Sequence, residues 1–197
     1  FDMNRSIMPD SASAEKIYGK VGKEHAIIVG MIDFGTCDID HLQPCSESYL
    51  DGIRVIFKKR VMKEAIAFCH QVKALGYKVF TQAVSITSYN DDELLDLVNL
   101  VNELQPFAVS MVDTYGLLQQ ENLRHIFHVM DAHLLPDICL AYHAHNNFQL
   151  GYANSIEILS TDSQRDLLVD GTLYGMGKSA GNTPIELLAM YMNENLG

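Results

Sequence analysis

Two histidines separated by one residue are the first feature of this chain that could do chemistry. His143 and His145 end an apolar run that begins at Ile138 and reads as a buried strand. Side chains on a strand alternate between its two faces, so both imidazoles are expected to project to the same side. Two convergent imidazoles can hold a divalent metal ion, although a histidine on an apolar strand is more often a hydrogen-bonded core residue. The pair therefore predicts a metal site only if its surroundings supply further ligands.

Other polar residues stand where predicted strands end. Asp33 closes the first strand, Asp113 and Thr114 the fourth, and Asp170 the sixth. The carboxyl ends of parallel strands share one edge, which is where chemistry occurs in a barrel of such strands. The Thr114 hydroxyl and the backbone N–H groups beside it could hold a substrate carboxylate, with a plain turn from strand to loop as the alternative.

A glycine-rich segment, Gly175–Asn182, precedes the last predicted helix. A loop of this kind before a helix N-terminus can hold an anion, and the alternative is a loop with no ligand. The segment does not match the Walker A pattern of nucleotide-binding proteins. No cysteine lies near enough to these residues to suggest a thiolate zinc site, so the donors are imidazole and oxygen. These donors suit Mn²⁺, Fe²⁺, Co²⁺ or Zn²⁺ and, with more oxygens, Mg²⁺.

A repeated alternation of strand and helix positions these residues. Apolar runs predict strands over His25–Phe34, Gly52–Phe57, Lys78–Ile86, Pro106–Val112, Ile138–His145 and Leu167–Leu173. Helical patterns cover Arg60–Leu75, Asp91–Leu104, Gln119–Leu134 and Asn147–Leu159, and a last helix opens with a capping box over Thr183–Glu186. Asn90 is the expected N-cap of the second helix. Continuous apolar strands indicate an α/β fold with a parallel sheet.

Two architectures fit this rhythm: a (β/α)₈ barrel with about six of its units present, and a doubly wound sheet. No Gly-x-Gly-x-x-Gly follows the first strand, which weighs against a dinucleotide-binding fold.

Composition excludes several classes of protein. The chain has 197 residues, 48% of them hydrophobic, and a formal net charge of −11, which disfavours nonspecific binding to nucleic acid or to an anionic membrane. No apolar stretch reaches the roughly 18 residues that a membrane span needs, and no signal peptide is visible. The four cysteines form no Cys-x-x-Cys pair and predict reduced thiols in a cytoplasmic protein.

The motifs taken together resemble those of a known superfamily. The segments that carry the resemblance are Asp113-Thr114-Tyr115-Gly116, His143–Asn147 with Leu150–Ser155, and Asp170–Gly177 with Ala180-Gly181-Asn182. They are similar to the metal-dependent (DRE-type TIM-barrel) aldolases and lyases, which include 4-hydroxy-2-oxovalerate aldolase, HMG-CoA lyase and isopropylmalate synthase. The similarity is specific over about Val109–Glu186. It is nearest to the hydroxy-oxovalerate aldolase branch, because of the Leu-Gly-x-Ala-Asn-Ser stretch and the Gly-Met-Gly…Ala-Gly-Asn loop.

The resemblance implies a (β/α)₈ barrel in which the six strands are strands three to eight. We therefore expect one aldolase/pyruvate-carboxyltransferase-like domain over residues 1–197, a fragment without the first two strands. The family's first strand carries an Arg-Asp pair that supplies a metal ligand and polarises the substrate, and no such pair follows an apolar run here. The family's general base cannot be located either, so no catalytic residue is assigned.

The resemblance also assigns roles to residues that are present. It makes His143, His145 and Asn182 ligands of a divalent metal, Mn²⁺ or Mg²⁺ first, with Zn²⁺ or Co²⁺ as alternatives. It places Thr114 and Gly177 against the substrate. It makes Asp113 and Asp170 residues that hold loops or orient ligands rather than catalysts.

The implied reaction is the reversible cleavage of a 4-hydroxy-2-oxo acid through a pyruvate enolate. The expected partners are a 2-oxo acid such as pyruvate, an aldehyde, further copies of the chain and, as in some aldolases of this branch, an aldehyde dehydrogenase. A Schiff-base route would need a desolvated lysine, and Lys58 and Lys59 read instead as solvated charge near a helix start.

Three alternatives stay open. One is a Claisen-type synthase that condenses an acyl-CoA, like isopropylmalate or citramalate synthase. Another is an HMG-CoA lyase-like enzyme, although the glycine-rich loop lacks that branch's cysteine. The third is a truncated barrel without catalytic activity.

Overall fold

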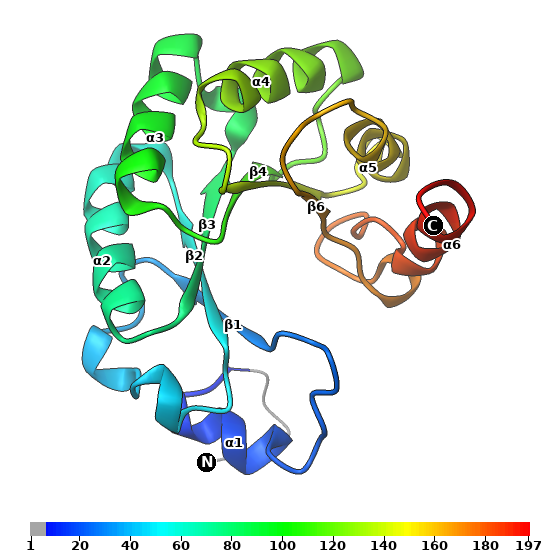
Figure 1. Cartoon of the computed structure of the whole chain (residues 1–197). Coiled ribbons are helices and arrows are strands. Elements are labelled where there is room, and N and C mark those ends of the chain that lie inside the picture. The colour runs from blue at the N-terminus through cyan, green and yellow to red at the C-terminus, as the bar shows by residue number, and fades with distance from the viewer. Residues whose placement is uncertain (1–6) are drawn as a thin grey trace.

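Six parallel strands form one sheet in which neighbours in sequence are neighbours in space (Figure 1). The computed structural model describes residues 7–197. The strands are β1 (Val29–Asp33), β2 (Gly52–Phe57), β3 (Lys78–Val84), β4 (Ala108–Asp113), β5 (Cys139–Ala144) and β6 (Leu167–Val169). All six predicted strands are confirmed. The first and last are shorter than the apolar runs suggested, because these runs continue into the loops that flank the sheet.

Helices follow most strands and lie along the outside of the curved sheet (Figure 1). They are α1 (Ala12–Tyr18), α2 (Met62–Ala74), α3 (Asp91–Leu104), α4 (Gln120–His133), α5 (Gly151–Leu159) and α6 (Ile185–Asn195). The strand order β1-β2-β3-β4-β5-β6 never reverses. A doubly wound sheet requires a reversal of strand order with helices on both faces, so the structure selects the barrel-type alternative.

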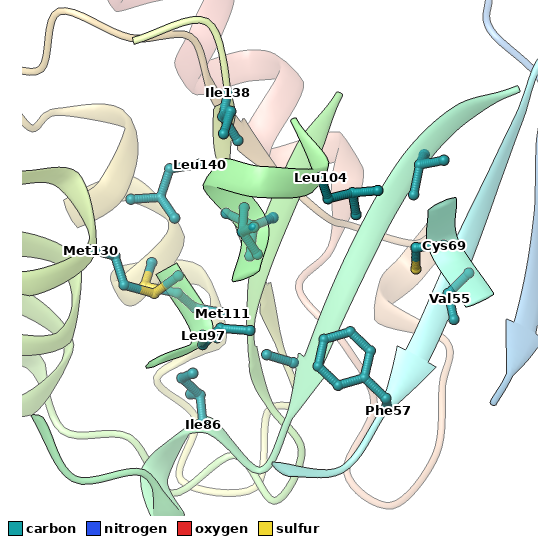
Figure 2. Packing of buried hydrophobic residues seen from close by; sticks show 14 of the residues in the cluster. Val55, Phe57, Cys69, Ile86, Leu97, Leu104, Met111, Met130, Ile138 and Leu140 are labelled. Atoms are coloured by element: carbon teal, nitrogen blue, oxygen red, sulfur yellow. The ribbon is translucent and has the colours of Figure 1, made fainter. Parts of the chain in front are cut away.

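The main core lies between the outer face of the sheet and the helices (Figure 2). Val55, Met111 and Leu140 point outward from three strands and are each at most 1% exposed. They pack in one cluster with apolar residues of α2, α3 and α4, including Cys69 and Leu97. The helical stripes predicted from a period of 3.6 residues are therefore the faces that meet the sheet.

Local signals explain where α3 begins. The Asn90 side chain accepts a hydrogen bond from the Glu93 N–H, and the Glu93 carboxylate accepts one from the Asn90 N–H, both at 2.9 Å. This capping box satisfies two backbone donors that would otherwise lack partners. The predicted N-cap at Asn90 is confirmed.

Two predicted helix starts are wrong. α5 begins at Gly151 rather than Asn147, because the Asn146 side chain accepts from the Gly151 N–H at 3.0 Å and keeps the preceding residues in a loop. α6 begins at Ile185, and its N-cap, Pro184, makes no side-chain capping bond. The Glu186 carboxylate accepts instead from the Tyr174 N–H at 2.6 Å, so the predicted capping box over Thr183–Glu186 does not form.

Two further findings concern membrane-spanning helices and cysteines. Within residues 7–197, no helix combines the length and the apolar character needed to cross a membrane. All four cysteines carry free thiols, as their spacing predicted.

Candidate metal centre at the carboxyl edge of the sheet

The inner face of the sheet, opposite the face that the helices cover, carries a row of paired side chains from neighbouring strands. The strand pairing puts Arg54 opposite Phe80, Phe80 opposite Ala108, and Ala108 opposite Cys139. His143 lies four residues after Cys139 on the same strand, and therefore on the same face. Arg54 and His143 thus point to the enclosed side of the curved sheet, away from the helices.

The two predicted histidines come together at the end of β5. Their ring centroids lie 5.1 Å apart at an interplanar angle of 74°. His143 Nδ1 lies 3.0 Å from the Asp170 carboxylate, and His145 Nδ1 lies 3.2 Å from the Asp113 carbonyl oxygen. Both acceptors favour a proton on Nδ1, and in a neutral ring a proton on Nδ1 leaves the Nε2 lone pair free. An acceptor on the far nitrogen is how proteins orient histidines that bind metals.

Asp170 connects His143 to a residue on a distant strand of the same sheet, Arg54 of β2. Arg54 Nη1 and Nη2 bind the two Asp170 carboxylate oxygens at 2.6 and 2.7 Å. Burial raises the pKa of Asp170, but hydrogen bonds from His143 and Arg54 outweigh it and lower the pKa to about 2. Asp170 is therefore a carboxylate at any physiological pH and a permanent acceptor for His143.

Asn182, the third predicted ligand, is held beside the histidines by backbone pairing. An isolated antiparallel bridge joins it to His145, and its Nδ2 donates to the Met176 carbonyl at 3.2 Å. Its Oδ1 is buried and has no hydrogen-bond partner among residues 7–197. A buried amide oxygen without a partner is costly, and a bound cation would satisfy it.

Gly177 leaves the space that the Asn182 amide occupies. A Cβ at residue 177 would lie 2.7 Å from Asn182 Cγ and closer still to Nδ2, so any larger residue would displace this side chain. The glycine-rich loop is thus shaped around the amide. Contact between Gly177 and a substrate stays a prediction.

The loop after β4 contains two of the predicted residues. The Asp113 carboxylate accepts from the Leu117 and Leu118 N–H groups at 3.0 Å each and holds this loop closed. Thr114 Oγ1 accepts from the Ser85 N–H at 2.7 Å, which leaves its hydroxyl hydrogen available to an acceptor. Asp33, by contrast, ends β1 with an exposed side chain.

The donors present fit a divalent metal, but they do not complete a coordination shell. Two imidazole Nε2 atoms and one orphaned amide oxygen are nitrogen and oxygen ligands of the kind that Mn²⁺, Mg²⁺, Co²⁺ and Zn²⁺ accept. Within the part of the chain that the structure describes, no group of three His, Cys, Asp or Glu side chains could hold a metal ion.

Sequence reasoning missed Arg54. The signal was an arginine in the middle of Gly52–Phe57, a strand that is otherwise apolar. A long cation in a buried strand needs a counter-charge, and that alone predicts an acidic partner inside the sheet. Which acid it meets could not be read from the sequence, because the partner lies 116 residues away.

Comparisons with known proteins bear on the family and the fold. The HMGL-like family model matches residues 1–196. Among curated relatives, an oxaloacetate decarboxylase of Mycobacterium tuberculosis is 29% identical over 140 residues, which is 71% of this chain and 40% of that protein. A 4-hydroxy-2-oxovalerate aldolase of Shewanella woodyi is 27% identical over 156 residues, which is 78% of this chain and 44% of that protein. The chain thus spans less than half the length of these relatives.

Solved structures share the fold at lower identity. The N-terminal domain of a putative aldolase from Bacteroides vulgatus superposes with a TM-score of 0.73 at 21% identity, over 95% of this chain and 61% of that one. An HMG-CoA lyase from Bacillus subtilis gives 0.74 at 14% identity, over 92% and 67%. Because the family model matches nearly all of the sequence, this chain belongs to the HMGL-like family.

Proposed function

We propose that this chain forms part of the active site of a metal-dependent carbon–carbon lyase that cleaves a 4-hydroxy-2-oxo acid into pyruvate and an aldehyde. The observation that carries the proposal is the pair of imidazoles whose Nδ1 atoms are both occupied by acceptors, beside the orphaned Asn182 amide oxygen. His143 and His145 would hold the metal through Nε2 and Asn182 through Oδ1, with Mn²⁺ or Mg²⁺ expected. The bound metal supplies Lewis acidity, which stabilises negative charge that develops on a 2-oxo acid.

The protein's own groups supply orientation. The Asp170 carboxylate and the Asp113 carbonyl hold the two rings so that neither can turn away from the site. The Thr114 hydroxyl, whose oxygen accepts from the Ser85 N–H, would donate its hydrogen to a substrate carboxylate near the end of β4. Fixing groups before the reaction avoids the cost of ordering them during it.

The names of the relatives point to one shared chemistry. Cleavage of 4-hydroxy-2-oxovalerate and decarboxylation of oxaloacetate both break a carbon–carbon bond one carbon removed from a 2-oxo group, and both leave the enolate of pyruvate. A decarboxylase is therefore the second candidate, and it rests on the relative that carries that name.

Two competing routes are less well supported. A Schiff base needs a lysine amine that is free to attack a carbonyl, whereas Lys59 Nζ is engaged by the Ser88 carbonyl at 2.6 Å and by the Glu93 carboxylate at 2.8 Å. An HMG-CoA lyase-like reaction remains disfavoured by the absence of a cysteine from the glycine-rich loop.

The test is the exchange of pyruvate methyl protons for deuterium, followed by ¹H NMR in D₂O with and without Mg²⁺. We expect exchange only with metal, and a loss of at least about 100-fold in His143→Ala and in His145→Ala, since each removes a ligand. His128→Ala changes an exposed histidine on α4 and is the matched control. Exchange that survives removal of the metal would exclude this mechanism.

Two further results separate the alternatives. Release of pyruvate from oxaloacetate, but not from a 4-hydroxy-2-oxo acid, would favour the decarboxylase. Metal binding that depends on both histidines, with no exchange at all, would favour a barrel without catalytic activity.

A further inference from the structure

Arg54 is the residue whose placement the fold alone does not explain. It lies in β2, and its partner Asp170 directly follows β6, with three strands between them in the sheet. The pair therefore spans the enclosed side of the sheet rather than joining neighbours. The Arg54 guanidinium carbon lies 5.7 Å from the centre of the Phe80 ring, which supports it from the adjacent strand.

The two Asp170 oxygens are not used equally. Oδ1 accepts from Arg54 alone, whereas Oδ2 accepts from both Arg54 Nη1 and His143 Nδ1. A carboxylate with one partner can rotate about its side-chain bonds. A guanidinium that grips both oxygens fixes the plane of the carboxylate as well as its position. Arg54 thus determines where Oδ2 presents its lone pair to the imidazole.

The Arg54–Asp170 ion pair is not expected to add much to the stability of the fold. The side chains of Arg54 and Asp170 are only 27% and 16% exposed, so both charges lose much of their hydration. Buried ion pairs of this kind often contribute little net stability compared with apolar residues of the same size. The orientation of His143 is the more specific consequence of the geometry.

We propose that Arg54 is a positioning residue for metal binding, which acts by clamping Asp170 so that His143 keeps a single orientation with Nε2 free. This inference rests on the metal site proposed above. Arg54 itself touches neither metal nor substrate in this scheme. Its guanidinium is committed to Asp170, so it is not a free cation for a substrate carboxylate.

The test is a double-mutant cycle on Mn²⁺ affinity, measured from the electron paramagnetic resonance signal of free Mn²⁺. Groups that orient metal-binding histidines typically change metal affinity 10- to 100-fold, so we expect Arg54→Met to weaken Mn²⁺ binding about tenfold. In a His143→Ala background the same change should have no further effect, because Arg54 acts through that ring.

Two more variants sharpen the test. Arg54→Lys keeps the charge but cannot grip both oxygens, so its affinity should lie between wild type and Arg54→Met. It also carries the test if Arg54→Met fails to fold, since wild-type affinity in Arg54→Lys would then overturn the proposal. Arg124→Met removes the exposed Arg124–Glu157 pair on α4 and α5 and should bind Mn²⁺ like wild type.

The outcomes are distinguishable. A lower melting temperature with unchanged Mn²⁺ affinity in Arg54→Met would reduce Arg54 to a structural role and overturn the inference, as would additive effects in the cycle. If His143→Ala binds Mn²⁺ as wild type does, the metal site itself is wrong. If His143→Ala loses binding while Arg54→Met keeps it, only the inference about Arg54 fails.

Discussion

At the scale of single residues, the two histidines of the candidate site are held by unlike acceptors. His143 donates toward a carboxylate and His145 toward a backbone carbonyl. A carboxylate polarises an imidazole more strongly than a neutral carbonyl does. We therefore expect Nε2 of His143 to bind a metal ion more strongly than Nε2 of His145 does. Two residues with the same side chain are therefore expected to contribute unequally to one site.

Gly177 offers a direct test of the Asn182 side chain. In Gly177→Ala the new methyl group would overlap the Asn182 amide and push Oδ1 out of place. We expect Mn²⁺ affinity to fall about tenfold, with little change in melting temperature because residue 177 is exposed. Lys178→Ala, an exposed change in the same loop, is the control. Unchanged affinity in Gly177→Ala would show that the Asn182 amide is not a ligand.

At the scale of elements, local patterns predicted the strands and most helices, and they failed where side chains from distant loops intervene. The apolar stripe of α2 packs on the sheet as expected, with Cys69 completely buried. α5 starts late because the residues before it serve other loops: Asn147 Nδ2 donates to the Tyr115 carbonyl, and Asn147 Oδ1 accepts from the Ala180 N–H. Helical periodicity does not register such commitments.

The buried thiol of Cys69 on α2 makes the free energy of unfolding depend on pH in the alkaline range. Burial raises the pKa of Cys69 from 9.0 to about 12. Between these values the folded protein keeps a proton that the unfolded chain releases, so stability is fully present below the unfolded pKa and is lost as pH rises. From about pH 9 to 10, we expect the free energy of unfolding of wild type to fall by about 1 kcal/mol more than that of Cys69→Ala.

Chemical denaturation at a series of pH values measures this difference. Val72→Ala shortens another buried side chain on the same face of α2 without removing an ionisable group. It should lower stability at every pH and keep the wild-type slope. Equal slopes in wild type and Cys69→Ala would contradict the role of the thiol.

At the scale of the whole molecule, the sheet is curved but its edges are open. β1 and β6 each pair on one side only within the described residues. Met31 on β1 is 67% exposed, and Met190 on α6 is 58% exposed. The segment from the short 3₁₀ helix Leu173–Gly175 through α6 carries more exposed apolar side chains, namely Leu173, Tyr174, Met176, Ile185, Leu187, Met192 and Leu196. Unpaired edges beside such surfaces favour association between chains.

The 197-residue chain is therefore expected to self-associate at concentrations on the order of 100 µM. Met31→Lys combined with Met190→Lys should lower the mean mass measured by light scattering, because charges on an edge and on an apolar face oppose association. Leu135→Lys places the same charge at an exposed apolar residue after α4 and should leave the mass unchanged. A monomeric wild-type chain would refute the prediction.

Sequence alone determined the βα rhythm and the parallel sheet, because strands and helices repeat with periods of two and about 3.6 residues along a local stretch of chain. It also put His143 and His145 on one face of a strand, because they lie two residues apart. It also supported the family, through motifs confined to about Val109–Glu186. Tertiary structure decided which residues complete the site. The link from Arg54 through Asp170 to His143 and the buried oxygen of Asn182 depend on how far the sheet curves and which loops meet. Such contacts join residues far apart in the chain, and only the packed sheet brings them within bonding distance.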